Sequence, residues 1–399
     1  MTTTASPPAD TVGVSRPCNR CKEQEGTIDL RGAEVVCKSC FAYYVSSKAI
    51  KRLEALQRET RRASGPRRPQ RYLVGLSCGA SSTALLHVLT ENAAQQRARG
   101  QKVARVEYAA AHVVDDTSAP RASVPGGPGG TCLSAYRARF PDAELLSIPL
   151  SAALDVPAVG WGALPPPDPA LPPAQRLSDV LDRLPSATSR ADARRLLVRH
   201  LLVAAAAGRG CDALLLGHNT TSLAELTLAE TAKGRGFSLP HLVNDGAAPV
   251  GSGPDSAGGA RTLPIYSPLR ELFRKELATY LSHTSPPLTP LLLPPSPRGG
   301  GGAVVSHRDL SIDDVLARYF GEVETSYPSV VANVVRTTGK LLRRGGEGQH
   351  DTCGLCGTVL DELGDERWRG EIGDDRGEED DDGREKPRLC YGCERSVRG

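Results

Sequence analysis

The sequence of 399 residues lacks long apolar runs, an export signal and a marked excess of charge. No apolar run approaches about 20 residues, the length that crosses a bilayer, so the sequence predicts no membrane span. Residues 1–15 lack the basic-then-apolar layout of a secretory signal and are expected to form a disordered tail. A net charge of +3 does not by itself indicate a nucleic-acid partner. Only 39% of the residues are apolar, and the 41 glycines and 31 prolines predict long loops or disordered insertions.

Cysteines are present in closely spaced pairs, and eight of the eleven form four C-x-x-C motifs. In a chain without an export signal, such pairs favour thiolates bound to metal in a reducing compartment, which predicts a cytoplasmic protein. The first four are Cys18, Cys21, Cys37 and Cys40. The 15 residues between these two pairs are typical of a zinc ribbon, with unpaired thiols or an iron–sulfur cluster as alternatives. Four cysteine ligands close the coordination sphere, so a zinc ion there is structural and not catalytic.

The second set of paired cysteines is Cys353, Cys356, Cys390 and Cys393. The gap of 33 residues between its pairs is long, but it contains an acidic run at 374–385 that is expected to loop out as a solvated spacer. A second four-cysteine zinc site is expected here, and two half-sites serving other partners are the alternative.

The stretch 71–88 predicts an anion-binding turn. RYLVGLSCGASSTALLHV has the pattern of a buried strand, a turn of small hydroxyl-bearing residues and an apolar helix. Backbone N–H groups at the start of a helix lack intrahelical partners and attract anions, and small residues let the backbone approach a phosphate. The candidate nucleotide-binding residues of this turn are Ser77, Gly79, Ser81, Ser82 and Thr83. An ordinary strand-to-helix turn is the alternative.

After this turn, expected helices and strands alternate, which predicts an α/β protein with a parallel sheet. A helix at 84–99 between strands at 72–76 and 102–114 makes a β-α-β unit. Further helices are expected at 131–140, 175–184, 190–207, 311–320 and 330–344, strands at 144–150 and 212–216, and one amphipathic helix over 263–281. Residues 157–173 have the composition of a proline-rich insertion. Cys132, beside the Pro/Gly-rich loop 115–130, is expected to be an isolated thiol, with a nucleophile as the alternative.

The predicted organisation places an N-terminal zinc module and a basic helix at 16–70 and the α/β domain, with disordered insertions, at 71–285. A linker at 286–302, a helical segment at 303–345 and a C-terminal zinc module with its acidic loop at 346–399 follow. The basic helix after Cys40 is a candidate RNA-backbone surface, with a solvated helix face as the alternative. Its candidate RNA-binding residues are Lys48, Lys51, Arg52, Arg58, Arg61, Arg62, Arg67 and Arg68.

The turn at 77–83 resembles the SGGxDS loop of the ATP-pyrophosphatase (PP-loop) family, whose fold is adenine nucleotide alpha hydrolase-like. Cys78 replaces the first glycine of that pattern, and Ser81 replaces its aspartate. In sulfur-transferring members a later strand is followed by GHN, two aspartates and an Ala-Glu pair. The matching positions are Gly217, His218, Asn219, Ala224 and Glu225, and the first three complete the candidate nucleotide-binding set. Thr221 and Ser222 replace the two aspartates.

The order of these motifs is similar to that of the cytoplasmic tRNA 2-thiolation protein 2 family. The resemblance rests on CNRCKEQ and CKSCF within 18–41, GASSTALLH at 79–87, the GHN motif and the C-terminal cysteine pairs ending in LCYGC. It implies a partner subunit of a tRNA thiouridylase heterodimer, acting on the wobble uridine of tRNAs for Lys, Glu and Gln. The resemblance also implies that the sulfur comes from a thiocarboxylated ubiquitin-related modifier.

The departures from the PP-loop pattern indicate a subunit that does not perform the chemistry. Thiolation needs ATP with Mg²⁺ to activate the uridine and a thiolate or iron–sulfur site to deliver sulfur. Three expected carboxylates are hydroxyls here, and active relatives carry a cysteine where this chain has Ser186, Thr188 and Ser189. Zinc is therefore the expected cofactor, and Mg²⁺–ATP is not expected. Two alternatives are a self-sufficient PP-loop ATPase that adenylates RNA and a zinc-stabilised scaffold without an RNA role.

Overall fold

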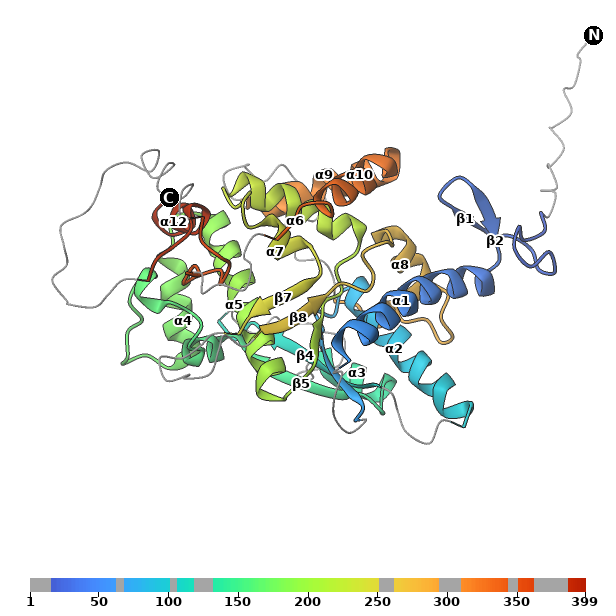
Figure 1. The fold of residues 1–399 in the computed structure, drawn as a ribbon, viewed down its shortest axis with the longest axis horizontal. Coiled ribbons are helices and arrows are strands. Elements are labelled where there is room, and N and C mark those ends of the chain that lie inside the picture. Colours follow the sequence, from blue (N-terminus) through green and yellow to red (C-terminus); the bar gives the residue numbers. More distant parts are fainter. Residues whose placement is uncertain are drawn as a thin grey trace, which may run out of the picture.

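The computed structural model describes residues 16–61, 68–100, 106–117, 132–250, 262–293, 310–343, 351–361 and 387–399 (Figure 1). The expected tail at 1–15 and the acidic run at 374–385 lie outside these residues. Within the described residues, none of the helices combines the length and the apolar character needed to cross a membrane.

A six-stranded sheet forms the centre of the protein, in the order β5-β4-β3-β6-β8-β7. Its strands are β3 (Gln70–Gly75), β4 (Val106–Val114), β5 (Glu144–Pro149), β6 (Ala213–Leu215), β7 (Gly246–Pro249) and β8 (Thr262–Tyr266). All neighbours pair in parallel except β7 with β8, which is antiparallel. The predicted parallel α/β sheet is therefore confirmed, and so is the β-α-β unit in which β3 and β4 pair.

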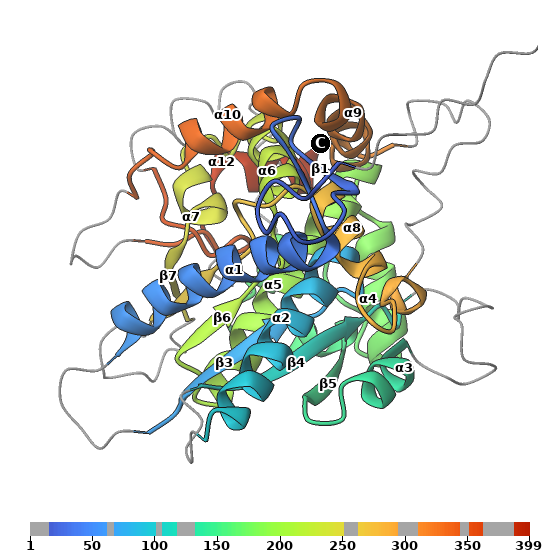
Figure 2. The ribbon, with the colours of Figure 1, turned by 90° about the vertical axis from the view of Figure 1, so that its right-hand side faces the viewer.

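Alternate residues of the strands face opposite layers of helices, as strand geometry requires. Tyr72 and Val74 of β3 pack with α1 (Lys38–Thr60) and α2 (Ala80–Ala98). Leu73 packs on the other face, with Leu202 and Val203 of α5 (Ala187–Gly208). Figure 2 shows α1 and α2 crossing in front of β3 and β4. The central strands are consequently buried on both faces, which explains why their sequences are nearly continuous apolar runs.

Smaller elements complete the two layers. On the side of α1 are the hairpin β1 (Ile28–Leu30) and β2 (Glu34–Val36), with α3 (Cys132–Arg139), α8 (Arg274–Ser282) and the short 3₁₀ turn η3 (Thr289–Leu291). On the side of α5 are the 3₁₀ turns η1 (Leu150–Asp155) and η2 (Trp161–Ala163), with α4 (Pro173–Asp182) and α12 (Tyr391–Arg398). A third group of helices is α6 (Thr220–Ala232), α7 (Leu239–Val243), α9 (Ile312–Ser326) and α10 (Pro328–Thr338). In this group α9 and α10 lie along α6 (Figure 1).

Two sequence predictions of helices need correction. The segment 263–281 is not one helix, because its first part forms β8 and only its last part forms α8. Buried Leu263 and Ile265 alternate with less buried neighbours, which is the period of a strand. The expected helix 330–344 is shorter: α10 ends at Thr338, with Gly339 at its C-cap.

The proline-rich stretch 157–173 is folded against other parts of the chain. It contains η2, and Val159 and Leu164 are buried in the same apolar cluster as Cys353 and Cys393. The backbone N–H of Gly160 donates to the carbonyl oxygen of Gly354 at 2.7 Å. This stretch therefore forms part of the surface on which the C-terminal cysteines pack.

Candidate functional site

The candidate site is the crevice where the carboxyl ends of β3 and β6 meet. The strands after β3 are added on one side of it, as β4 and then β5, whereas β6 and β8 are added on its other side. The order of the strands across the sheet therefore changes direction between β3 and β6. Ligands of open α/β sheets bind at such switch points. At Gly217, which follows β6, an added Cβ would lie 2.8 Å from the backbone N and Cα of Ser82. Only glycine therefore allows the turns after β3 and β6 to approach this closely.

The turn after β3 is held by its own hydroxyl groups. Ser82 donates to the carbonyl oxygen of Gly79 at 3.2 Å, and its Oγ lies 3.1 Å from that of Ser77. Thr83 Oγ1 donates to the same carbonyl at 2.8 Å and lies 2.6 Å from the Tyr136 hydroxyl. Gly79 is the N-cap of α2, and no side chain caps this helix. Its first backbone N–H groups are therefore left for a ligand or water.

The GHN turn after β6 is joined to the first turn. Asn219 caps α6: its Oδ1 accepts from the backbone N of Ser222, and its backbone N donates to Ser222 Oγ, both at 2.8 Å. The Nδ2 of Asn219 donates to Ser81 Oγ at 2.7 Å, which links the two turns directly. Burial, and then the charges of Arg199 and Arg195, lower the pKa of His218 to about 4. His218 is therefore neutral at physiological pH and supplies no positive charge for a phosphate.

The hydroxyls that replace the PP-loop carboxylates are used in the fold. Ser81 accepts the bond from Asn219, and Ser222 completes the cap of α6. Thr221 Oγ1 donates to Glu324 Oε2 of α9 at 2.6 Å. Mg²⁺ is held mainly by carboxylates and by the phosphates of its nucleotide. The residues at these positions do not fit a Mg²⁺–ATP site of the PP-loop pattern.

The start of α5, where the PP-loop resemblance implies a cysteine in active members, also has a structural role here. Ser186 caps the helix by accepting a hydrogen bond from the backbone N of Ser189 at 3.0 Å. Thr188 Oγ1 accepts from the backbone N of Ile312, the first residue of α9, at 3.1 Å. The hydroxyls therefore cap α5 and connect it to α9, and they provide no thiolate.

One cysteine cluster beside the crevice was missed in the sequence. Cys132 was expected to be an isolated thiol, but the structure places it next to Cys78 of the turn and His112 of β4. Cys78 adopts a φ of 58°, a left-handed conformation that is unusual for a residue other than glycine. No sequence signal links these residues, because 54 positions separate the two cysteines.

Both sets of paired cysteines converge as expected from their spacing. Within each set all four sulfur atoms lie within 4.8 Å of one another. The Sγ atoms of Cys21 and Cys37 are 3.8 Å apart, and so are those of Cys356 and Cys390. Four thiols gathered in this way fit a tetrahedral zinc ion, and they also fit an iron–sulfur cluster. The geometry therefore supports two metal-binding groups, one at each end of the chain.

The basic helix α1 contacts the body of the protein through several of its predicted RNA-binding residues. Arg52 forms ion pairs with Asp245 and Glu271, and Lys48 lies 3.9 Å from Glu271. Beyond the helix, Arg68 pairs with Asp212 at 2.7 Å. The side chains of Lys51, Arg58 and Arg61 are placed along the same helix and its C-cap, whereas Arg62 and Arg67 lie outside the described residues.

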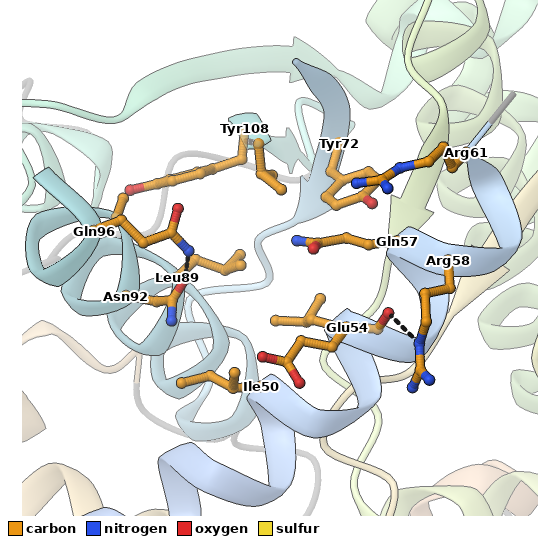
Figure 3. A pocket seen from close by; sticks show the side chains of 13 residues that line it. Ile50, Glu54, Gln57, Arg58, Arg61, Tyr72, Leu89, Asn92, Gln96 and Tyr108 are labelled. Carbon is orange, nitrogen blue, oxygen red and sulfur yellow. Dashed lines mark hydrogen bonds between the residues drawn. The ribbon is translucent and has the colours of Figure 1, made fainter. Parts of the chain in front are cut away.

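A cavity of about 370 Å³ opens between α1, α2 and the strands β3 and β4 (Figure 3). Tyr72 and Tyr108 line one side, and Gln57 and Gln96 point into it from the two helices. Arg58, another lining residue, donates from its Nε to the carbonyl oxygen of Glu54 at 3.3 Å. The cavity is near the amino ends of β3 and β4, so it is separate from the crevice at their carboxyl ends.

A buried network of charges joins α5, α6 and the C-terminal cysteines. Arg235 is buried and forms ion pairs with Asp192 and Glu230, and its Nε donates to Cys393 Sγ at 3.4 Å. Lys233 lies 2.9 Å from Glu230 and 3.0 Å from Asp313 of α9. Sequence reasoning missed this network, although the stretch AETAKGRG places three charged residues at and just after the end of an apolar helix.

Comparisons with known proteins agree with this architecture. A family model described as cytoplasmic tRNA 2-thiolation protein 2 matches residues 311–386. The protein of that name from Phaeosphaeria nodorum is 36% identical over 96% of this chain and 95% of its own length. The one from Sclerotinia sclerotiorum is 36% identical over 82% of this chain and 83% of its own length.

Among solved structures, the U34-tRNA thiolase NcsA from Methanococcus maripaludis, with its 4Fe–4S cluster, is similar in fold. The TM-score is 0.52 at 15% identity, and the match covers 86% of this chain and 93% of the thiolase. The similarity supports the PP-loop-type arrangement of sheet and helices. On the strength of the sequence relatives, this chain belongs to the cytoplasmic tRNA 2-thiolation protein 2 family.

Proposed function

We propose that this protein acts in tRNA thiolation as the non-catalytic subunit of a thiouridylase heterodimer. The name of its family specifies tRNA 2-thiolation and the cytoplasm, and the fold it shares is that of a tRNA thiolase. In this proposal the heterodimer thiolates the wobble uridine (mcm⁵s²U) of tRNAs for Lys, Glu and Gln. The sulfur comes from a thiocarboxylated ubiquitin-related modifier and reaches the uridine at the catalytic partner.

One observation carries the non-catalytic assignment: three hydroxyls replace the carboxylates of the PP-loop pattern, and all three are engaged within the fold. Ser81 and Ser222 bond to Asn219, and Thr221 bonds to Glu324. Activation of the uridine oxygen by adenylation requires a metal-bound triphosphate, and the following step requires a sulfur nucleophile. The hydroxyls at these positions hold the crevice together through their hydrogen bonds, which supports a structural and not a catalytic role for this crevice.

The two four-cysteine groups are proposed to bind structural zinc. A closed set of four thiolates leaves no open coordination position for substrate, so its contribution is to hold the chain together. The N-terminal group begins α1, since Cys37 is the N-cap of this helix and Cys40 lies in its first turn. Metal at this site would therefore fix the position of the basic helix that we propose to contact tRNA.

A scaffold without an RNA role is the second candidate, and the ion pairs formed by basic residues of α1 and of the segment after it favour this candidate. Arg52 and Arg68 are neutralised by Asp245, Glu271 and Asp212, so their charge is partly used within the protein. Lys51 and Arg58 form no ion pair among the salt bridges of the described residues, so in the RNA-binding alternative they are the residues of α1 expected to contact phosphates. The two functions differ in whether the purified heterodimer loses tRNA affinity when these two charges are reversed.

The test combines a deletion with a reconstitution. Cells lacking this protein should lose 2-thiouridine at the wobble position, measured by mass spectrometry of digested tRNA, and the wild-type chain should restore it. The purified chain with ATP, Mg²⁺, tRNA and the thiocarboxylated modifier as sulfur donor should show neither pyrophosphate exchange nor thiolation, whereas addition of the catalytic partner to the same mixture should produce both. Thiolation by this chain alone would contradict the non-catalytic assignment, and unchanged wobble uridine in the deleted cells would contradict the role in thiolation.

A further inference from the structure

Cys78 and Cys132 meet at the edge of the crevice, beside His112. Their Sγ atoms are 3.2 Å apart, and Cys132 Sγ lies 3.5 Å from His112 Nε2. Cys78 is fully buried, whereas Cys132, at the start of α3, is half-buried and reaches solvent. An accessible thiol therefore lies next to a buried thiol, and the imidazole is near both, because His112 Nδ1 is 3.7 Å from Cys78 Sγ.

The hydrogen bonds of His112 determine the protonation of its ring, whose Nε2 faces the Cys132 sulfur. Its Nδ1 lies 2.7 Å from the carbonyl oxygen of Leu76, which accepts only, so Nδ1 carries a proton. Although burial opposes it, the hydrogen bonds with Cys132 and Leu76 raise the pKa of His112. The hydrogen bond from Cys78 and the neighbouring imidazole lower the pKa of Cys132 to about 5, so its thiolate predominates at pH 7. The same contact with Cys132, together with burial, raises the pKa of Cys78.

This arrangement differs from the two four-cysteine groups. There, facing sulfur atoms are 3.8 Å apart, a separation that leaves room for an ion between them. At 3.2 Å the sulfur atoms of Cys78 and Cys132 are in direct contact, as in an S–H···S⁻ hydrogen bond. A disulfide requires them to close to about 2.05 Å, which is a short movement of two side chains.

We propose that Cys132 and Cys78 form an oxidisable pair in which Cys132 reacts with a hydroperoxide and Cys78 then closes a disulfide. The Cys132 thiolate attacks one peroxide oxygen, so an S–O bond forms, the O–O bond breaks, and the departing oxygen takes a proton as water or alcohol. Cys78 then attacks the sulfur of the sulfenic acid, the S–S bond forms, and the hydroxyl leaves as water with the Cys78 proton. Two thiols are oxidised and one hydroperoxide is reduced.

The pair belongs to the crevice itself, because Cys78 lies between Ser77 and Gly79 of the turn. Its backbone carbonyl accepts a hydrogen bond from the backbone N of Leu293 at 3.0 Å, so the turn is also tied to the segment after α8. A disulfide would join this turn covalently to the start of α3. Oxidation would therefore cross-link the turn at the start of α2, which no side chain caps.

Peptide mapping of the full-length protein tests the proposal without any substitution. After brief treatment with hydrogen peroxide and alkylation of the remaining thiols, trypsin should release peptides 72–97 and 122–137 joined by a disulfide. In Cys78→Ser, where no disulfide can form, the sulfenic acid should persist on Cys132 and be trapped by dimedone. Limiting iodoacetamide at pH 7 should alkylate Cys132 roughly ten times faster than Cys211, an isolated thiol whose pKa is raised by burial.

The matched control is Cys211→Ser, which should leave the linked peptides unchanged, whereas Cys132→Ser should abolish them. Native mass spectrometry of the untreated protein should give the same number of bound metal ions for wild type and Cys132→Ser. An additional ion that disappears in Cys132→Ser would overturn the proposal in favour of a metal site. The absence of the linked peptides from peroxide-treated wild type, or alkylation of Cys132 no faster than that of Cys211, would also overturn it.

Discussion

Removing the charge of Arg235 is the sharpest test of how this fold is stabilised. The side chain of Arg235 is completely buried, and so are the carboxylates of Asp192 and Glu230 with which it pairs. Its Nη2 also donates to Ser396 at 3.2 Å, and its Nε donates to the Cys393 sulfur. Arg235→Met keeps most of the apolar stem and removes only the guanidinium. Two buried acids then keep their charge with one cation fewer.

The expected loss follows from the cost of uncompensated buried charge. Breaking a buried ion pair by removing one partner costs about 3–5 kcal/mol. With a denaturant dependence of roughly 3 kcal/mol per molar urea, the unfolding midpoint should fall by about 1 M or more. The matched control is Arg209→Met, because Arg209 pairs with Glu144 while 41% of its side chain is exposed. Such exposed pairs contribute about 1 kcal/mol or less.

Urea unfolding followed by intrinsic fluorescence measures both variants, since Trp161 packs in the apolar cluster that contains Cys393. A double-mutant cycle with Asp192→Asn should recover part of the loss, because the uncompensated carboxylate is then removed as well. If Arg235→Met and Arg209→Met lower the free energy of unfolding by the same amount, the buried network stabilises the fold no more than an exposed ion pair does.

Three further predictions concern acid, RNA and metal. Although burial opposes it, Arg195 and the neighbouring bases hold the pKa of Glu230 below its usual range. The contribution of Glu230 to stability is therefore present above its unfolded pKa of about 4.5 and is lost progressively as the pH falls below that value toward the folded pKa. In Glu230→Gln the urea midpoint should accordingly depend less on pH between pH 6 and pH 3 than it does in the wild type. Reversing Lys51 and Arg58 together should weaken tRNA binding by the heterodimer and reduce its salt slope by about 2, as filter binding at several salt concentrations would measure; an unchanged slope would place RNA elsewhere. Chelation of bound metal should lower the thermal midpoint, and Cys353→Ser should reduce both the metal content and the response to chelator, measured by elemental analysis and calorimetry.

Much of the fold was predictable because local patterns specify it. The strand at 70–75, the small-residue turn and the helix after it carry a clear change of hydrophobic period, and the C-x-x-C pairs converge because their spacing suits one ion. The segment 263–281 was harder: Pro264 and Pro268 interrupt the helical pattern, and the short strand β8 is specified mainly by its pairing with β6 and β7. The pairing of β8 with its neighbours therefore determines that residues 262–266 form a strand, which the local sequence pattern alone does not specify.

The candidate site was only partly predictable, for the same physical reason. Ser81 and Asn219 were each recognised from motifs, but their mutual hydrogen bond depends on the parallel pairing of β3 and β6. The contact of Cys78 with Cys132 depends on β4 and α3, and that of Arg235 with Cys393 joins residues 158 positions apart. Such contacts have no periodic signature, because nothing in a local pattern records which distant segment comes to lie beside it.

The pairing of Arg235 with Cys393 has a consequence for how the molecule is made on the ribosome. Because 158 positions separate the two residues, Arg235 leaves the exit tunnel long before its sulfur partner is translated. At about 5–20 residues per second this interval is on the order of ten seconds or more. Throughout that interval the surface on which the C-terminal cysteines later pack is exposed on the nascent α/β domain, and Arg235 lacks its contact with Cys393. We therefore expect chaperones to bind the nascent chain at this surface.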